Sequence, residues 1–194
     1  MLFNKKNRFS ISEKQIKEEI KSPEGIIALR LNLRYPELKC PARDPLSVNA
    51  VPFYKRIAEG FADYARHELA PVAFAASKSE GFAPYSAVMT YEKCFDDEKY
   101  LSFFIDVSVS DGIEPPIIER KTQVWERKFG TKCRFVDFFE PKDACTIFEG
   151  VEKRAADREL FVMREGGLEF FIRKENRYEP IFASFEKISQ KICK

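Results

Sequence analysis

IIALRLNLRY, residues 26–35, alternates apolar and polar side chains with a period of two. Leu29, Leu31 and Leu33 point to one side of the extended chain, and the polar residues between them point to the other. This alternation predicts a β-strand with one buried face. Pro36 follows directly and is expected to end the strand, because proline has no backbone N–H to give to a sheet.

The segment before this strand, residues 8–20, fits two structures. Its apolar residues are Phe9, Ile11, Ile16 and Ile20. Their spacing suits a bulged strand and a short helix about equally. The turn residues of Lys21–Gly25 favour a strand that pairs with residues 26–35.

A long helical pattern follows, from about Pro52 to Ser77. Its apolar face consists of Tyr54, Ile57, Ala58, Phe61, Ala65, Leu69 and Val72. Residues at these steps of three and four share one face, which is expected to bury against a sheet. Asn49 is the expected helix cap, and Pro52 is tolerated in a first turn. Pro71 is expected to kink or divide the helix near Ala70.

The period of two returns after Gly81, in a run from Tyr85 to Lys93 and again in Tyr100–Ser110. The polar tip Asp96–Lys99 separates the two runs, which predicts an antiparallel hairpin. The elements expected beyond it are a strand at Ile117–Arg127, a turn at Gly130-Thr131, helical structure in Lys142–Ala156, and a hairpin of Leu160–Met163 with Leu168–Ile172. Ile181, Phe185, Ile188 and Ile192 are spaced as in an amphipathic helix, expected over residues 180–193.

These patterns predict an α+β fold, in which an antiparallel β-sheet of hairpins is packed against the long helix and one or two further helices. The length of 194 residues and a hydrophobic content of 44% suit a single domain, residues 1–194, that needs no disulfide or metal. Within it we distinguish a hairpin and helix over residues 8–78, a sheet-rich part over 82–175 and the helix at 180–193.

Charge and cysteine content exclude several classes of protein. The 33 basic and 31 acidic residues are interspersed, which does not favour nucleic-acid binding. The five cysteines are odd in number and widely spaced, unlike a disulfide framework or a zinc site. Scattered thiols suit a reducing cytosol, and no apolar run has the length of a signal peptide or a membrane span. We therefore expect a cytoplasmic protein.

Residue types that could perform catalysis are few. A nucleophilic triad or dyad with histidine would have to use His67, the only histidine, which more simply is an exposed helix residue. Cys94 lies at a hairpin end and is either a reactive thiol or, as we favour, a small apolar residue. Asp96, Asp97 and Glu98 form a solvated turn better than a calcium loop, and glycine-rich phosphate loops are missing. We expect no catalytic residue, metal or cofactor.

Trp125 is the one tryptophan and the leading candidate for ligand binding. Gln123 and Arg127 lie on the same face of the predicted strand, so the neighbours of Trp125 on that face are polar. On an open face, the indole ring could anchor a protein partner or a sugar. The alternative, which we favour, is a partly buried tryptophan at a sheet edge. The candidate binding residues are therefore Trp125, Gln123 and Arg127.

An ordered series of short motifs indicates a family. The motifs are Tyr35-Pro36-Glu37-Leu38, Val48-Asn49, Leu101-Ser102-Phe103-Phe104, Thr122-Gln123-Val124-Trp125, Gly130-Thr131, Val136-Asp137-Phe138-Phe139 and the hairpin from Phe161 to Phe171. Their order over residues 8–175 resembles the RsiV-like family, which includes the extracellular domain of a lysozyme-sensing anti-sigma factor and the N-terminal region of a peptidoglycan deacetylase. The resemblance implies an antiparallel sheet with packed helices, in a domain that binds and does not catalyse.

The chain departs from the family pattern at Ser110–Pro116, where the family has a Gly-Gly-Ala-His stretch, and it lacks the signal and anchor of the secreted members. Lysozyme binding is therefore not carried over. The function expected from the sequence is a non-enzymatic module that recognises a protein or a glycan. The alternatives are a structural or regulatory homo-oligomeric subunit and, less favoured, a carbohydrate-active enzyme with two carboxylates.

Overall fold

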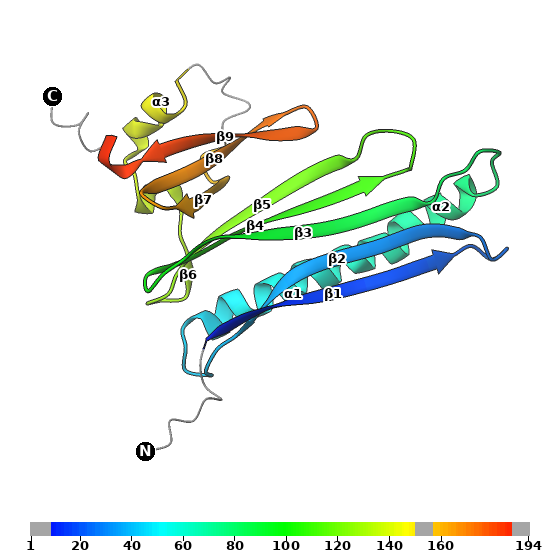
Figure 1. Ribbon diagram of the computed structural model, residues 1–194, viewed down its shortest axis with the longest axis horizontal. Coiled ribbons are helices and arrows are strands. Elements are labelled where there is room, and N and C mark those ends of the chain that lie inside the picture. The colour runs from blue at the N-terminus through cyan, green and yellow to red at the C-terminus, as the bar shows by residue number, and fades with distance from the viewer. Residues whose placement is uncertain (1–8, 150–156, 188–194) are drawn as a thin grey trace. The chain divides into compact units, whose positions relative to one another are not determined.

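The structure is a computed structural model that describes residues 9–149 and 157–187. The fold is α+β, as the sequence predicts, with mostly antiparallel strands and a 31-residue helix (Figure 1). The strands form a six-stranded sheet of order β1-β2-β3-β4-β5-β6 and a three-stranded sheet of order β7-β8-β9. The described chain divides into two compact units, residues 9–91 with 105–119 (unit 1) and residues 92–104 with 120–149 and 157–187 (unit 2). That the whole chain is one domain stays a prediction.

The strands are β1 (Ser10–Lys21), β2 (Ile27–Lys39), β3 (Tyr85–Asp96), β4 (Tyr100–Ser110), β5 (Ile117–Glu126), β6 (Thr131–Lys132), β7 (Phe161–Arg164), β8 (Gly167–Lys174) and β9 (Arg177–Ser184). The helical segments are α1 (Leu46–Tyr64), η2 (Ala65–Leu69), α2 (Ala70–Ala76), η3 (Phe135–Asp137), η4 (Pro141–Asp143) and α3 (Ala144–Ile147). Within residues 9–149 and 157–187, no helix combines the length and the apolarity that a bilayer crossing requires.

Strands β1 and β2 form the first hairpin, which confirms a strand in residues 8–20. They pair antiparallel, with Ile16 opposite Leu33. The expectation that Pro36 ends β2 is wrong, because the strand continues to Lys39 with Pro36 opposite Glu13. The ladder of β2 with β3 spans only residues 29–33, so Pro36 lies where β2 has a single partner strand. A proline is tolerated at such an edge, where its missing N–H removes no sheet hydrogen bond.

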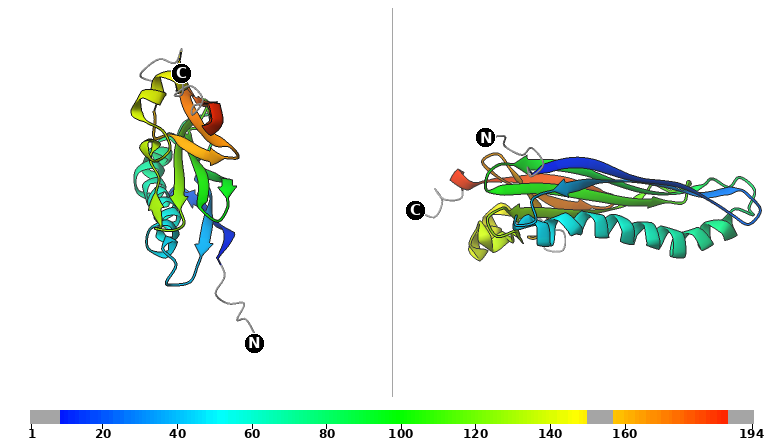
Figure 2. Two further views of the ribbon diagram at one scale, coloured as in Figure 1. Left: turned by 90° about the vertical axis from the view of Figure 1, so that its left-hand side faces the viewer. Right: turned by 90° about the horizontal axis from the view of Figure 1, so that it is seen from below.

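Strand β3 is parallel to β2, with Leu29 opposite Tyr85 and Leu33 opposite Met89. The sequence patterns predict an antiparallel sheet, and this parallel pair corrects that prediction. Parallel neighbours cannot be joined by a tight turn and need a crossover connection, which here is the long helix. The helix packs against β2 inside unit 1, and Figure 2 shows it covering one side of that strand.

The long helix begins earlier than its pattern suggested. It starts at Leu46, whose N–H donates to Oδ1 of Asp44 at 2.9 Å. Asp44 therefore satisfies a free amide of the first turn, and Asn49, the expected cap, lies inside the helix. Pro52 is likewise an interior residue and not a first-turn residue.

Pro71 divides the helix near Ala70, as predicted. The turn before it, η2, is π-helical, and the Ala70 N–H donates to the carbonyl of Ala65, five residues earlier. Pro71 has no N–H to give to the carbonyl four residues before it, and a wider turn accommodates its ring. The face toward the sheet remains buried on both sides of the break, from Ala62 and Ala65 to Ala73.

Unit 2 has a core rich in phenylalanine. Val124 of β5 joins a cluster from β7, β8, β9 and the short helices. Its aromatic members are Phe135, Phe139, Phe148, Phe161 and Phe170. Phe170 lies at the centre, with ring centroids of Phe148 at 5.1 Å, Phe161 at 5.5 Å and Phe135 at 5.9 Å. The predicted hairpin of β7 and β8 supplies two of these rings.

The expected helix at residues 180–193 is wrong over its first part. Residues 177–184 form strand β9, in which Ile181 lies opposite Phe170 and Ala183 opposite Leu168. The pairing with β8 buries Ala183 and leaves Phe182 half exposed, which is a period of two. Of residues 180–193, only Phe185–Lys187 are helical in the part that the structure describes, and residues 188–193 lie outside that part. In Lys142–Ala156, the described helical part is η4 and α3, and residues 150–156 lie outside the described chain.

Two glycines give opposite predictions for substitution by alanine. A Cβ on Gly167 would overlap the carbonyl oxygen of Ala183 and lie 2.8 Å from Cζ of Phe182. We expect Gly167→Ala to destabilise the protein by about 2 kcal/mol or more, as overpacked cores do. Gly60 lies in α1 with open space at its Cβ position, so Gly60→Ala should stabilise by roughly 0.5–1 kcal/mol. Urea unfolding of both variants checks this, and equal midpoints would contradict it.

Candidate binding surface

The residues that the sequence analysis singled out on β5 do not form an open face. Gln123 is 2% exposed and Trp125 is 4% exposed, and Trp125 is paired with Lys132 of β6. The open-face interpretation of Trp125 is therefore wrong, and the tryptophan is buried at the end of β5. In this conformation neither side chain offers a ligand an accessible surface.

Arg127, the third candidate, fixes the turn that follows β5. Its guanidinium forms an ion pair with Asp96, whose other carboxylate oxygen lies 3.0 Å from Nζ of Lys93. Its backbone N–H donates to the carbonyl of Lys99 at 2.8 Å. Arg127 thus ties residues 127–130 to the tip of the β3–β4 hairpin inside unit 2. Its side chain is only 18% exposed, so it positions the turn more than it offers a contact.

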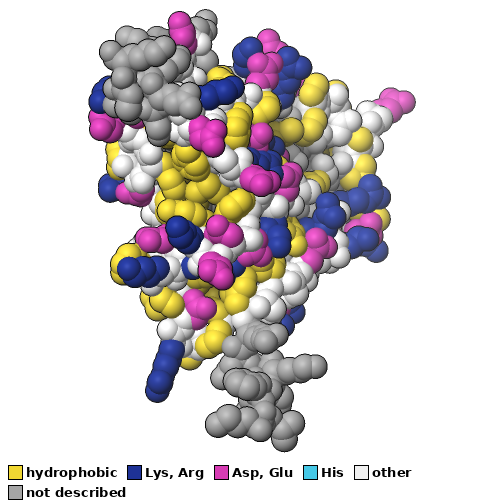
Figure 3. Space-filling model, turned by 60° about the vertical axis from the view of Figure 1, so that its left-hand side comes forward, with side chains coloured by type: hydrophobic (Ala, Val, Ile, Leu, Met, Phe, Trp, Pro, Cys, Tyr) yellow, Lys and Arg dark blue, Asp and Glu magenta, His cyan; other side chains and the backbone are white. Residues whose placement is uncertain are grey.

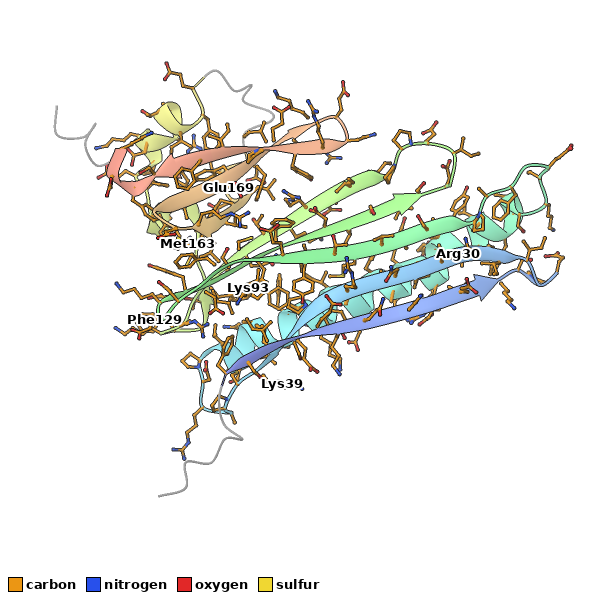
Figure 4. The ribbon with its side chains drawn as sticks, in the orientation of Figure 1. Arg30, Lys39, Lys93, Phe129, Met163 and Glu169 are labelled. Carbon is orange, nitrogen blue, oxygen red and sulfur yellow. The ribbon has the colours of Figure 1, made fainter. Side chains whose placement is uncertain are left out.

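The exposed aromatic residue lies two positions further on. Phe129 is 60% exposed at the turn of residues 127–130, named here the Phe129 turn (Figure 4). Gly130 has a φ of 64° and donates its N–H to the carbonyl of Glu126 at 2.8 Å, which closes the turn. The Nζ of Lys128 lies 4.9 Å from the centroid of the Phe129 ring. The turn at Gly130-Thr131 was predicted from the sequence, but the exposure of Phe129 beside it was not, because exposure depends on the segments that pack around the turn.

Residues of both charges lie close to the Phe129 turn in the sequence. On the face of the molecule that Figure 3 shows, basic and acidic side chains are likewise interspersed. The acidic residues at the tip of the β3–β4 hairpin stabilise the turn of that hairpin. Oδ1 of Asp97 accepts hydrogen bonds from the N–H groups of Lys99 at 2.8 Å and Tyr100 at 2.6 Å. Asp96 binds Lys93 and Arg127, so two of the three acids are engaged in holding the tip together. In residues 9–149 and 157–187, no three His, Cys, Asp or Glu side chains cluster as metal ligands would.

A second polar and aromatic group in unit 2 connects its two sheets. The guanidinium carbon of Arg120 lies 3.9 Å from the ring centroid of Phe104, 4.4 Å from that of Phe171 and 5.2 Å from that of Tyr178. The backbone N–H of Arg120 also donates to the Tyr178 hydroxyl at 3.1 Å. Arg120 therefore links β5 to β8 and β9 by cation–π contacts. This group was not predicted from the sequence, because Phe104, Phe171 and Tyr178 lie on three different strands and come together with Arg120 only in the folded chain.

Cys94 lies near a half-buried ion-pair group. Arg164 contacts Glu92 at 2.9 Å and Glu169 of β8 at 2.8 Å. Burial, above all, raises the pKa of the Cys94 thiol to about 12, and burial likewise raises the pKa of Cys133 to about 11. Both thiols are protonated at neutral pH, which removes the nucleophilic form. His67 is exposed in the π-helical turn, as expected of a surface residue.

Comparisons with known proteins identify the fold and no more. No family model matches the sequence, and no curated protein matches it. A DUF3298 family member from Bacteroides fragilis has a similar structure, with a TM-score of 0.69 at 13% identity over 95% of this chain and 93% of that chain. A DUF3298 family protein from Pseudomonas aeruginosa gives a TM-score of 0.54 at 10% identity over 93% of each chain. The DUF3298 and RsiV-like folds are related, so the resemblance in sequence holds at the level of fold.

The thiols should differ strongly in reactivity. With pKa values of about 12 and 11, Cys94 and Cys133 hold very little thiolate at pH 8, and we expect both to react with iodoacetamide at least about tenfold more slowly than the exposed Cys145. Peptide mass spectrometry over a time course measures each site separately. Protein unfolded in urea is the control, in which the sites should react alike. Equal labelling of Cys94 and Cys145 in the folded protein would show that Cys94 is a reactive thiol.

Proposed function

We propose that this protein is a non-catalytic binding module that recognises a protein or glycan partner through the Phe129 turn. The observation that carries the proposal is the 60% exposure of Phe129 on a turn held by Arg127 and Gly130. Large aromatic side chains are enriched at binding hot spots, where they bury much apolar area with few rotatable bonds.

The rigidity of the turn supports the proposal. Binding costs free energy when loops must be ordered, and a preformed turn avoids most of that cost. Here the ion pair of Arg127 with Asp96 and two backbone hydrogen bonds fix the backbone on both sides of Phe129. The Arg127 N–H donates to the Lys99 carbonyl, and the Gly130 N–H donates to the Glu126 carbonyl. The Nζ of Lys128 lies 4.9 Å from the ring centroid of Phe129 and adds a cation beside the apolar contact. An apolar side chain or the apolar face of a sugar ring suits such a surface.

The titratable groups support the non-catalytic part of the proposal. In the described chain, the carboxyl groups whose pKa clearly departs from its ordinary value all have a lowered pKa. These groups are Glu18, Glu24, Glu37, Asp111 and Glu179. In each, the largest cause is a hydrogen bond that favours the charged form. A general acid of the glycosidase type needs the opposite shift, a pKa raised toward neutrality.

The proposal predicts that binding depends on Phe129 and not on exposed aromatic area in general. Full-length tagged protein, Phe129→Ala and Phe182→Ala are compared for the partners each retains from lysate of the source cell, with quantitative mass spectrometry and a tag-only control. Phe182 is the matched control, because it is 53% exposed on β9 of the same unit. We expect a partner that is lost about tenfold or more in Phe129→Ala and kept in Phe182→Ala.

A glycan array with the same three proteins covers the other partner class. Retention of every specific partner and glycan by Phe129→Ala, with an unchanged thermal midpoint, would contradict a role for the turn. Equal loss in both variants would also contradict it, because it would indicate damage to unit 2 and not removal of a contact.

A further inference from the structure

The most exposed large apolar side chain among the described residues belongs to unit 1, whereas the Phe129 turn belongs to unit 2. Ile113 is 82% exposed in the loop Ser110–Pro116 between β4 and β5, named here the Ile113 loop. Ile117, at the start of β5, is 65% exposed. An isolated exposed aliphatic residue is ordinary on a protein surface. Ile113 differs from such a residue in the structure of its loop.

Hydrogen bonds from two side chains hold the loop in one conformation. Oδ1 of Asp111 accepts from the N–H groups of Ile113 and Glu114, each at 2.9 Å. Oγ of Ser110 accepts from the Gly112 N–H at 3.0 Å and donates to the Glu114 carbonyl at 3.3 Å. The two amides that bind Asp111 lower the pKa of its carboxyl group, so the bonded form is charged at neutral pH. Every amide from Gly112 to Glu114 is engaged.

Gly112 also restricts the shape of the loop, through its backbone conformation and its close packing. Its φ is 82°, a conformation that favours glycine, and a Cβ there would lie 2.7 Å from Cβ of Ala83. The loop thus rests on the segment that leads into β3, inside unit 1. Pro115 and Pro116, which follow, restrict the backbone further. A fixed loop with an aliphatic residue at its tip is preorganised for insertion.

We propose that the Ile113 loop is a second recognition element, which inserts Ile113 into an apolar pocket rimmed by lysine or arginine side chains on a partner protein. The charge of the loop argues for this class of partner. Asp111 and Glu114 flank the exposed isoleucine, and Glu119 lies two residues beyond Ile117. Complementary cations around the pocket would steer the encounter and fix its orientation.

The same charges argue against the other occupants of an exposed apolar tip. Membrane surfaces and nucleic acids are anionic and would repel Asp111 and Glu114. Two copies of this chain meeting loop to loop would bring like charges together beside the apolar contact. On a different protein, an apolar pocket would bury Ile113, and lysine or arginine side chains at its rim would pair with Asp111 and Glu114.

The test places a photo-reactive benzoylphenylalanine at position 113 of the full chain, and in a control chain at position 72. Val72 is 54% exposed on α2 in the same unit, which makes it a matched aliphatic site. Both chains are irradiated in lysate of the source cell at about 50 mM and about 500 mM NaCl, since salt screens exposed charges. We expect one dominant protein adduct at position 113, weaker at high salt and lacking at position 72.

Purified partner from that adduct is then titrated with Ile113→Ser, Glu114→Lys, Gly112→Ala and Val72→Ser. We expect about tenfold or greater loss of affinity for Ile113→Ser and Gly112→Ala, a slower association for Glu114→Lys at low salt, and no change for Val72→Ser. Gly112→Ala keeps the apolar side chain of Ile113 and disturbs the loop conformation and its packing against Ala83.

Four results of the cross-linking would overturn the proposal: no adduct at position 113, equal adducts at both positions, a covalent dimer of this chain, or an adduct with lipid or nucleic acid. A fifth contradictory result is an affinity for the purified partner that changes neither with Glu114→Lys nor with salt. The cross-link at position 113 does not depend on Phe129. Failure here therefore leaves the proposal for the Phe129 turn intact, and the reverse also holds.

Discussion

Strand β2 is the constraint on which the organisation of unit 1 depends. It pairs with β1 on one side and β3 on the other, and Leu29, Leu31 and Leu33 on its inner face are at most 1% exposed. Full burial of a leucine side chain contributes roughly 1.5–3 kcal/mol. The helix can cover these leucines closely because its buried face is largely alanine, from Ala50 to Ala73. The parallel pairing of β3 follows, since the chain returns to β2 only after the helix has crossed.

The two proposed contact sites share one physical design, although they lie in different units. In each, an apolar side chain is exposed on a short connection between strands, and hydrogen bonds hold the backbone beneath it. At the Phe129 turn the restraints are an arginine ion pair and a glycine amide, and at the Ile113 loop they are an aspartate and a serine. Each connection includes a glycine with positive φ. Rigid connections on a sheet are well suited to present contact residues at low entropic cost.

Prediction from sequence succeeded where the pattern is local. The alternation in residues 26–35 and 100–110 identified strands because side chains on a strand change faces at every residue. Pro71 was correctly placed at a break in the helix, since the loss of its N–H needs no tertiary context. Residues 180–184 were wrongly predicted as the start of a helix, because the apolar residues from Ile181 onward are spaced by three and four. There the pairing of β9 with β8 decided the structure.

The sequence by itself determined the α+β class, most strands, the long helix and the division of that helix, because all of these depend on local periodicity and on proline. Only the tertiary structure decided that β2 and β3 are parallel, that Trp125 is buried, and that Phe129 and Ile113 are exposed. Exposure of a side chain depends on which distant segments cover it, and the residues around it in sequence do not identify those segments. The groups around Arg120 and Phe170 have the same origin, because their rings come from strands and helices far apart in the chain.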